Sequence, residues 1–455
     1  MCYYVINILK WVIAMNNSQA VIIVKNHEAL RVAASSARIS TQQGTALEIF
    51  ARSEGGEKDL NLIGKVLASG HKSVIEHQTF SVAFNNVSVM VEQFVIEARL
   101  NSYTVKSRRY VDFAGAGFVA PEGLTDAQGK LYADTMAARF ADYEKLMALG
   151  VPKEDARFVL PYCLRSNFFM TLNARSLINL ICAMVAGRGR GFAEVESLGK
   201  QLQAQFDELY PGVVDKELKR YPECAPVALP EEIDAPREGV GEASLLSSTA
   251  NGMAVLEAAM GFSGRFEPDM GMMMTQKNVR SLLLDARPRD LELLNFVFGV
   301  QHISLACLTH FVRHRVDSPI VPPVLAALAG GSYVMPETVK AVAEAEIVYR
   351  AAFEAQAKAA REALALGIAP ANVSYFALSG HQIDILLGMN ARELLHFMKL
   401  RTCSRAQWEI RGVAGEMLLQ LQQEMPALFG MYGPSCRFGP CPEGRMSCGK
   451  PQERI

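Results

Sequence analysis

The sequence repeats itself at a spacing of 216 to 217 residues, and this repeat constrains the fold more than any other feature. The segment LNARSL at 172–177 returns as MNAREL at 389–394, and MALG at 147–150 returns as LALG at 364–367. Solenoid repeats have periods of roughly 20 to 50 residues, whereas this period has the size of a domain. The 455 residues therefore predict two tandem copies of one domain of about 200 residues.

A segment rich in proline and glutamate separates the two copies. It runs from Tyr221 to Ala243, reads YPECAPVALPEEIDAPREGVGEA and has no apolar period, which is typical of a linker. The prediction is a first copy, a linker, a second copy and a cysteine-rich tail, over residues 19–222, 223–243, 244–430 and 431–455.

Apolar periodicity predicts the same order of elements in each copy. In the first copy, a helix is followed by a strand, a helical run, a polar loop and a long amphipathic helix. Their expected ranges are 28–36, 80–84, 87–98, 101–110 and 124–149. The second copy repeats the long helix at 336–366, in a segment rich in Ala and Glu. This order predicts an α/β (α+β) fold without the regular alternation of a doubly wound sheet.

Composition narrows the classes of function. Lys and Arg total 46 against 47 Asp and Glu, so the chain has no global positive field of the kind that nucleic acids favour. Nine cysteines, scattered and odd in number, disfavour a secreted disulfide framework. The apolar stretch Met1 to Ala14 is too short to span a bilayer and lacks a basic flank. We therefore expect a cytoplasmic protein without a nucleic-acid or membrane partner.

Three short segments carry polar groups suited to an anion. One is an Arg-His-Arg triplet after an apolar helix, whose guanidiniums can bind a pyrophosphate or a carboxylate bidentately. The second is a loop that combines a hydroxyl with two guanidiniums, and the third is a glycine-rich run. A solvated helix end and flexible loops are the alternative interpretations. The segments are Arg313-His314-Arg315, Ser107-Arg108-Arg109-Tyr110 and the GRGRG run at 187–191.

Two further segments are ambiguous when taken alone. SGHKSVIEH at 69–77 holds two histidines around a glutamate, which hints at a metal, but a polar loop with Ser73 as a helix N-cap is the alternative. The last helix of the second copy begins LRTCSRAQWEIR and carries Arg401 in a row of alternating charges, which also suits an exposed face.

Taken in chain order, these segments resemble the motifs of the flavin-dependent thymidylate synthases. That family has A-R-x-S, then H-x-S/T-x-x-E-H, a strand, and R-H-R-x-x-S-Y-x-x-x-S-x-R-Y. A-R-x-x-L-P and N-A-R-S-L follow, and L-R-x-x-x-x-A-Q-W-E-I comes last. The resemblance covers nearly the whole chain, once per copy. The run AQWEI at Ala406 to Ile410, behind Arg401, is its most specific part.

The motifs of the family are divided between the two copies. The first copy keeps A-R-x-S, the histidine-glutamate loop, S-x-R-Y, the arginine of A-R-x-x-L-P and N-A-R-S-L. It has Glu97 and Ala98 in place of the Arg-His pair, and Met184 in place of Arg401. The second copy keeps the triplet, the late arginine and AQWEI. It has lost the histidine-glutamate loop. Residues 320–323 stand in place of the S-x-R-Y run, and Ser374 stands where the first copy has Arg157. Losses that complement one another favour a division of labour between the copies.

The resemblance implies a role for each retained residue. Arg401 would be catalytic, because it would polarise the pyrimidine. The nucleotide and its phosphate would be bound by Ser107, Arg108, Arg109 and Arg157. FAD would be bound by Ser40, His71, Ser73, Glu76, Asn173, Arg175, Asn179, Arg313, His314 and Arg315.

The resemblance also implies a reaction and an assembly. The chain would methylate dUMP at C5 with methylenetetrahydrofolate and NADPH as co-substrates and FAD as the cofactor. The alternatives are a methylase of another uridine nucleotide and a non-catalytic homologue that binds flavin or nucleotide. Active sites of the family lie between the subunits of a homotetramer. Two domains per chain then predict a homodimer that forms a pseudo-tetramer.

The C-terminal tail adds a prediction of its own. It reads PSCRFGPCPEGRMSCGK, and glycines and prolines separate Cys436, Cys441 and Cys448. Cysteines in such a loop suit a zinc knuckle, with Cys403 as a conceivable fourth ligand. The spacings differ from the usual CxxC pair, and a tail with reactive thiols is the alternative.

Overall fold

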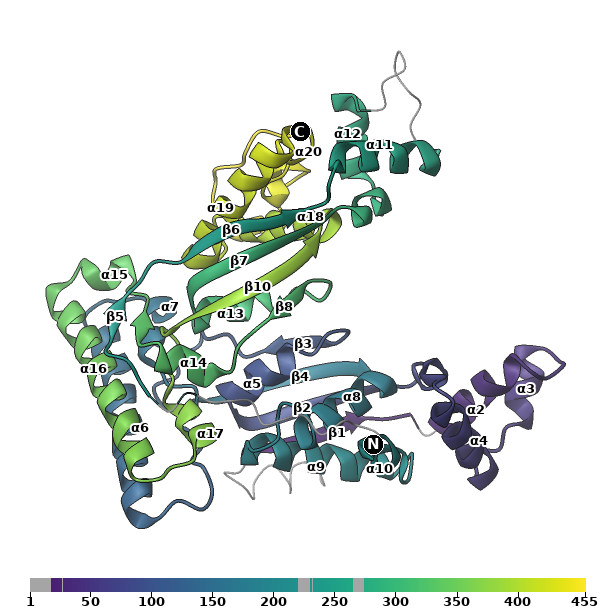
Figure 1. Cartoon of the computed structure of the whole chain (residues 1–455), viewed down its shortest axis with the longest axis horizontal. Coiled ribbons are helices and arrows are strands. Elements are labelled where there is room, and N and C mark those ends of the chain that lie inside the picture. Colours follow the sequence, from purple (N-terminus) through teal and green to yellow (C-terminus); the bar gives the residue numbers. More distant parts are fainter. Residues whose placement is uncertain (1–17, 27, 220–229, 231, 265–273) are drawn as a thin grey trace. The chain divides into compact units, whose positions relative to one another are not determined.

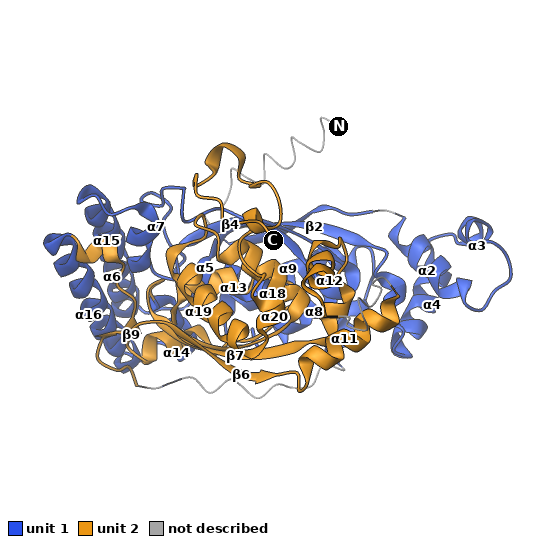
Figure 2. Ribbon diagram, turned by 90° about the horizontal axis from the view of Figure 1, so that it is seen from above, with its two compact units in different colours: residues 1–231, 342–377 blue, residues 232–341, 378–455 orange. Residues whose placement is uncertain are grey.

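The computed structural model describes residues 18–26, 28–219, 230, 232–264 and 274–455, which fall into two compact units. Unit 1 comprises residues 1–231 and 342–377, and unit 2 comprises 232–341 and 378–455 (Figure 2). The apolar segment 1–14 and most of the first half of the predicted linker lie outside the described residues. Each unit is built on one antiparallel sheet with helices packed against it, so the predicted mixed α/β class is confirmed.

The sheet of unit 1 has the order β1-β2-β4-β3, and every neighbouring pair is antiparallel (Figure 1). Along β2, Phe80, Val82 and Phe84 are fully buried, which is the alternation that predicted this strand. The short edge strand β3 lies where a polar loop was expected. It was missed because its four residues alternate between half-buried and exposed and pair on one side only. The bounds are β1 (Gln19–Val24), β2 (Thr79–Ser88), β3 (Ser102–Val105) and β4 (Arg165–Asn173).

The sheet of unit 2 repeats this arrangement, with the order β6-β7-β10-β8. Unit 2 also contains a separate two-stranded parallel sheet, in which β5 pairs with β9. Strand β5 and the start of β6 fall within 223–243, so the described end of the predicted linker is part of unit 2. The bounds are β5 (Arg237–Glu238), β6 (Glu242–Ser248), β7 (Asn295–Ser304), β8 (Ser318–Ile320), β9 (Ser332–Tyr333) and β10 (Gln382–Asn390).

The duplication reaches individual hydrogen bonds. In each unit, the side-chain amide of a helical glutamine accepts from an N–H of the first edge strand and donates to the carbonyl two residues earlier. The groups are Gln205 with Ile22 and Ala20, both at 2.8 Å, and Gln420 with Leu245 and Ala243, both at 2.6 Å. Each second strand also contains a residue in the left-handed region, Asn86 with φ 53° and His302 with φ 55°. These shared details give an independent register for aligning the two copies.

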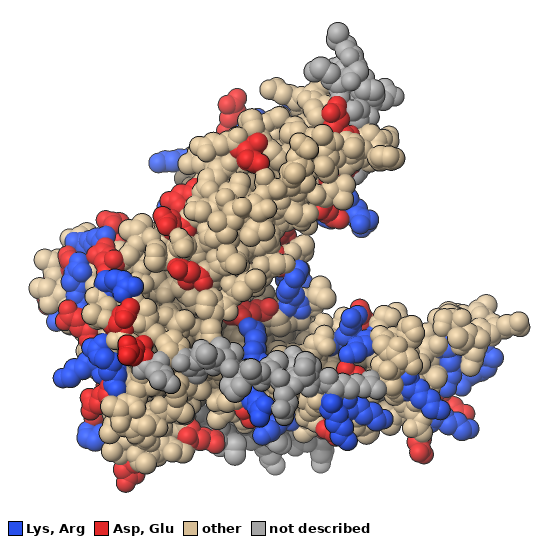
Figure 3. All heavy atoms as spheres, viewed as in Figure 1, with Lys and Arg blue, Asp and Glu red and all other residues tan. Residues whose placement is uncertain are grey.

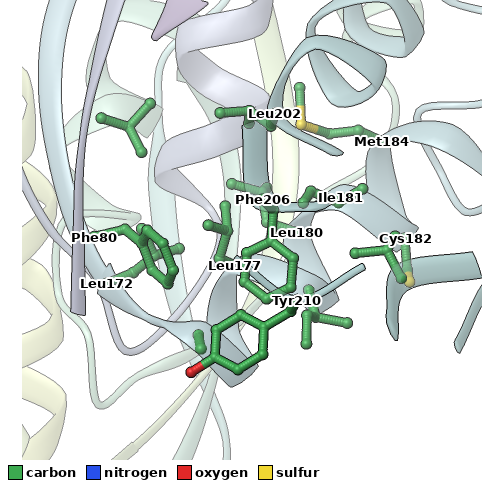
Figure 4. Close-up of a cluster of buried hydrophobic side chains, with 14 of the residues drawn as sticks. Phe80, Leu172, Leu177, Leu180, Ile181, Cys182, Met184, Leu202, Phe206 and Tyr210 are labelled. Carbon is green, nitrogen blue, oxygen red and sulfur yellow. The ribbon is translucent and has the colours of Figure 1, made fainter. Parts of the chain in front are cut away.

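Helices on one face of each sheet form the core. In unit 1, Phe206 of α9 lies 5.5 Å from the ring of Phe80 and 5.1 Å from the ring of Tyr210 (Figure 4). Burying an aromatic or aliphatic side chain of this size contributes about 1.5–3 kcal/mol. The helices of this face are α8 (Ala174–Val185), α9 (Ala193–Asp207) and α10 (Val213–Leu218).

In unit 2, α18 and α19 pack against the sheet at the positions that α8 and α9 hold in unit 1. Ser304 and Ser88, at the ends of β7 and β2, cap the helices α13 and α5 that follow. The bounds in unit 2 are α11 (Gly252–Ser263), α12 (Gln276–Leu284), η3 (Arg289–Leu293), α13 (Leu305–Phe311), α14 (Val324–Ala329), α15 (Glu337–Lys340), α18 (Ala391–Arg401), α19 (Trp408–Glu424), α20 (Pro426–Phe429), η5 (Ser435–Arg437) and η6 (Gly444–Met446).

Unit 1 contains both long helices, although one belongs to the second copy in sequence. The buried Arg139 of α6 donates to the carbonyl of Ala352 in α16 at 2.8 Å. Tyr375, which follows α16, donates to Glu194 at 2.6 Å. Acidic and basic side chains are interspersed over this helix pair on the face shown in Figure 3. The bounds are α6 (Asp126–Ala148), α7 (Lys153–Ala156), η2 (Arg157–Val159), α16 (Ala343–Ala365), α17 (Pro370–Val373) and η4 (Ser374–Phe376).

The first helices of unit 1 pack against one another. Arg38 of α2 forms an ion pair with Asp59 of α4 at 2.5 Å and donates to Ser53 at 2.7 Å. None of the helices in the described parts of the chain is long and apolar enough to cross a membrane. The remaining bounds in unit 1 are α2 (Ala29–Ile39), α3 (Ala46–Arg52), α4 (Glu57–Ala68), η1 (Lys72–Ile75) and α5 (Val89–Ile96).

Candidate functional site

Unit 1 holds an arginine cluster, which we define as Arg108, Arg109 and Arg157 with Glu92 and Glu154. Arg108 and Arg109 follow the edge strand β3, and the hydroxyl of Ser107 accepts from the N–H of Arg109 at 3.3 Å. Arg157 opens η2, one turn after Glu154, and donates from Nε to the carbonyl oxygen of Glu154 at 2.9 Å. The three predicted arginines therefore belong to one site of unit 1.

The arginine cluster is buried, and its carboxylates satisfy only part of it. Arg108 is 6% exposed and Arg157 is 3% exposed. Arg108 donates from Nη2 to Glu92 at 3.1 Å, and Arg109 is ion-paired with Glu154. Within the described part of the chain, Arg108 Nη1 and Arg157 Nη2 are buried and have no hydrogen-bond partner. Burial lowers the pKa of Arg157 to about 10, and the nearby positive charge of Arg108 adds to this effect.

Two buried guanidinium N–H groups without an acceptor point to an anionic ligand. An unsatisfied buried donor costs about 1–3 kcal/mol, and more when it is charged. An oxyanion within reach of either group would accept a charge-assisted hydrogen bond, which is about twice as strong as a neutral one. The chemistry of the arginine cluster thus fits a phosphate.

Unit 2 holds a second polar group, the histidine cluster, which we define as His310, His314, Glu393 and Arg401. Nδ1 of His314 lies 2.8 Å from Glu393 Oε1, and its Nε2 accepts from Arg401 Nε at 3.1 Å. Arg401 also donates from Nη2 to the carbonyl of His310 at 3.1 Å. His314 is 3% exposed, and burial lowers its pKa below the ordinary value. Its neighbours Arg313 and Arg315 are exposed, so the predicted triplet presents two arginines outward and one histidine inward.

A third predicted group lies in the region around η1 in unit 1. Glu76 forms an ion pair with Arg175 at 2.6 Å, which brings together two of the residues expected to bind FAD. Asn179 lies one turn after Arg175 on the exposed face of α8. The predicted FAD ligands His71 and Ser73 are exposed, as is His77. Ser73 lies inside η1, so the alternative role of Ser73 as an N-cap is wrong.

Two predicted FAD ligands have structural roles of their own. The side-chain oxygen of Asn173 accepts from the N–H of Ser176 at 2.8 Å and caps α8, and Asn390 caps α18 in the same way. Such a cap contributes about 1 kcal/mol. Ser40 stands at the C-cap of α2, where its hydroxyl donates to the carbonyl of Ala37 at 3.4 Å.

The second copy retains a glutamate that the sequence motif did not reveal. Glu292 in η3 is ion-paired with Arg392, as Glu76 is with Arg175 in the first copy. The hydrogen bond from Arg392 lowers the pKa of Glu292. The expectation that the whole histidine-glutamate loop is lost is therefore wrong for its carboxylate. The motif was hidden because the residues around Glu292 had changed, but the offset of 216 could have revealed it.

Each cluster exists in one copy only, and its members have been replaced together in the other. The strand registers align the first-copy residues with second-copy residues at offsets of 216 and 217. The arginine-cluster residues Glu92, Arg108, Arg109 and Arg157 correspond to Leu308, Val324, Leu325 and Ser374. The histidine-cluster residues His314, Glu393 and Arg401 correspond to Ala98, Ser176 and Met184, the last of which lies in the core (Figure 4). The same register places the lost S-x-R-Y run at 323–326, and not at 320–323.

In two other segments that were predicted to bind a ligand, the glycine-rich run and the cysteine-rich tail, side chains contact other parts of the protein. In the glycine-rich run at 187–191, Arg188 is ion-paired with Glu97 and lies 4.3 Å from the ring of Phe94. Cys436 accepts from the N–H of Gln452 at 3.4 Å. Across the described residues, no three His, Cys, Asp or Glu side chains are placed to hold a metal ion. Cys436, Cys441 and Cys448 are therefore not among any such group in the described residues, and zinc at these thiols stays a prediction.

Comparison with known proteins gives the family. The model of the family described as "Thymidylate synthase complementing protein" matches twice, at residues 21–212 and 244–427. The flavin-dependent thymidylate synthase of Geobacter sulfurreducens is 39% identical over 166 residues, which are 36% of this chain and 72% of that protein. That of Clostridium tetani is 30% identical over 204 residues, which are 41% of this chain and 81% of that protein.

Solved structures give weaker matches. Thymidylate synthase X of Helicobacter pylori, solved with FAD and dUMP, is 21% identical with a TM-score of 0.35, over 44% of this chain and 99% of that one. A UMP/dUMP methylase of Streptomyces cacaoi, solved with 5-Br UMP, is 21% identical with a TM-score of 0.37, over 46% and 97%. The double match of the family model confirms the predicted tandem duplication. The chain therefore belongs to the thymidylate synthase complementing protein family, whose relatives include the flavin-dependent thymidylate synthases, and it carries the domain of that family twice.

Proposed function

We propose that the chain methylates dUMP at C5, with FAD as the cofactor and with methylenetetrahydrofolate and NADPH as co-substrates. The arginine cluster is the observation that carries this proposal, because its two buried N–H groups without acceptors suit the phosphate of a nucleotide. The similar proteins of Geobacter sulfurreducens and Clostridium tetani are flavin-dependent thymidylate synthases, and the proposed reaction is the one these enzymes are named for. A methylase of another uridine nucleotide is the second candidate, since a phosphate site does not distinguish dUMP from UMP.

The residues of the chain have separate tasks in this proposal. Arg108, Arg109 and Arg157 bind the phosphate. Arg401, held at two of its nitrogens by His314 and His310, polarises the pyrimidine, where a positive charge stabilises the electrons that develop on a carbonyl oxygen.

Exposed donors near α8 and η1 in unit 1, and the two exposed arginines of the triplet in unit 2, each fit an anionic cofactor. The residues that would hold FAD are, in unit 1, the exposed Ser40, His71, Ser73, Arg175 and Asn179 with the half-buried Glu76 and Asn173, and, in unit 2, the exposed Arg313 and Arg315 with the buried His314. Reduced flavin would supply the hydride that completes the methyl group.

One experiment tests the reaction. The purified protein should carry flavin absorption bands that bleach with NADPH, and it should release tritium from dUMP labelled at C5 when methylenetetrahydrofolate is present. Labelled UMP in a parallel assay separates the two acceptors. Flavin bands without tritium release from either nucleotide would contradict the proposed enzyme and leave a non-catalytic flavin-binding homologue.

We further propose that the protein is a cytoplasmic homodimer. Two domains per chain and four domains in the assemblies of the family require two chains, and closed symmetry favours that number. Light scattering at micromolar concentration should give about twice the mass of the chain, which is 49.9 kDa. A monomer mass would contradict the dimer.

A further inference from the structure

Glu393 stands out in the histidine cluster because it is the buried acid of the group. It is 7% exposed, and its Oε1 lies 2.8 Å from Nδ1 of His314. Its position in the first turn of α18 is favourable for a negative charge, since the helix dipole is positive there. Its own N–H is bound by the side chain of Asn390 at 2.9 Å, which fixes the backbone at this point.

The geometry of the hydrogen bonds determines the tautomer of His314. An arginine nitrogen can only donate, so the bond from Arg401 Nε requires Nε2 of His314 to be an unprotonated acceptor. The proton of a neutral imidazole must then be on Nδ1, from which it is donated to Glu393. Burial, the largest effect, and the charge of Arg401 lower the pKa of His314, which agrees with a neutral ring. The titratable groups facing this ring are Glu393, Arg401 and His396, whose ring centroid is 5.6 Å away.

Comparison with the first copy indicates that Glu393 acts through His314 and Arg401. Where the second copy has His314, Glu393 and Arg401, the first copy has Ala98, Ser176 and Met184. Glu393 also departs from the N-A-R-S-L motif, whose serine the first copy keeps as Ser176. The carboxylate therefore occurs only in the copy that has both the histidine and the arginine.

We propose that Glu393 is a positioning residue, which holds His314 as the Nδ1–H tautomer so that Nε2 can orient the guanidinium of Arg401 toward the substrate. The role rests on the function proposed above, because Arg401 acts on the pyrimidine there. Removing the carboxylate frees His314 to rotate or to carry its proton on Nε2. That proton would face the N–H of Arg401 and turn the guanidinium away.

Three variants test the role of Glu393 in turnover. Glu393→Ala should lower kcat about 10- to 30-fold, with KM for dUMP within about threefold and flavin absorbance retained. Glu393→Gln should keep at least about a third of kcat, because the amide oxygen accepts the same proton. Glu424→Gln, which alters an exposed carboxylate that accepts from Ser248, is the matched control and should behave like the wild type. An unchanged kcat in Glu393→Ala, or a loss confined to KM, would overturn the role.

The tautomer is measured independently of turnover. In protein labelled with ¹⁵N-histidine, the signal of His314 is assigned by its loss in His314→Gln. We expect the Nδ1–H form in the wild type and in Glu393→Gln, and a change in Glu393→Ala. An Nε2–H ring in the wild type would overturn the proposal even if Glu393→Ala failed to fold. If no variant releases tritium, the proposed reaction fails, while the tautomer still decides whether Glu393 positions His314.

Discussion

Exchanging Arg157 for methionine is expected to lower the affinity for dUMP about a hundredfold without lowering the stability of the free protein. The lost phosphate contact is charge-assisted and desolvated, and such a contact contributes up to about 3 kcal/mol. In the free protein, Arg157 donates from Nε to the carbonyl of Glu154, but its Nη2 is buried without a partner, so the charge is only partly compensated before the nucleotide binds. Methionine fills a similar volume without that charge. Thermal unfolding with and without dUMP measures both effects.

Arg139→Met is the matched control for this prediction. Arg139 is also a buried arginine of unit 1, with 6% exposure and a buried Nε that has no partner, but its two terminal nitrogens are bound to Asp142 at 2.7 Å and to the carbonyl of Ala352 at 2.8 Å. Removing it leaves the half-buried carboxylate of Asp142 without its cation, so this variant should lose about 1–3 kcal/mol of stability and keep its affinity for dUMP. If Arg157→Met unfolded as readily as Arg139→Met and still bound dUMP normally, the arginine cluster would be a structural ion-pair network.

Much of the fold could be predicted because local periodicity and the long repeat both report on it. The helix expected at 124–149 is α6, and the strand expected at 80–84 is the centre of β2. The location of α16 in unit 1 could not be predicted, because its apolar stripe requires a partner but does not say which copy supplies it. The edge strands β3 and β8 were missed because a short strand paired on one side has little apolar pattern.

The arginines of the candidate site could be predicted from the sequence, but the acidic residues that contact them could not. Motifs single out Arg108, Arg109 and Arg157 because arginine is distinctive for phosphate. The partners Glu92 and Glu154 are ordinary residues of helices until the fold brings them to those arginines. One signal was available, since Glu154 stands three residues before Arg157 and so shares a helical turn. Glu393 could also have been noticed, because the repeat aligns it with a serine.

Arg401→Ala is expected to lower turnover about a thousandfold while flavin absorbance and the affinity for dUMP stay near those of the wild type. A donor aimed at charge that develops in the transition state is worth about 10²–10³ in kcat, and its loss removes little binding of the ground state. Arg401 is already held by His314 and His310, so this orientation is part of the folded unit and costs nothing at the moment of reaction.

Arg109→Ala should show the opposite pattern, with flavin retained and dUMP binding weakened about 10- to 100-fold, because Arg109 belongs to the phosphate site.

Each cluster occurs once per chain, so titration calorimetry of the wild type should give one dUMP per chain rather than two. Two nucleotides per chain would mean that a copy lacking the arginine cluster also binds dUMP. Full turnover in Arg401→Ala would mean that the histidine cluster is a structural network. Either result would refute the division of labour, whereas opposite defects with one nucleotide per chain require both clusters to serve the same reaction.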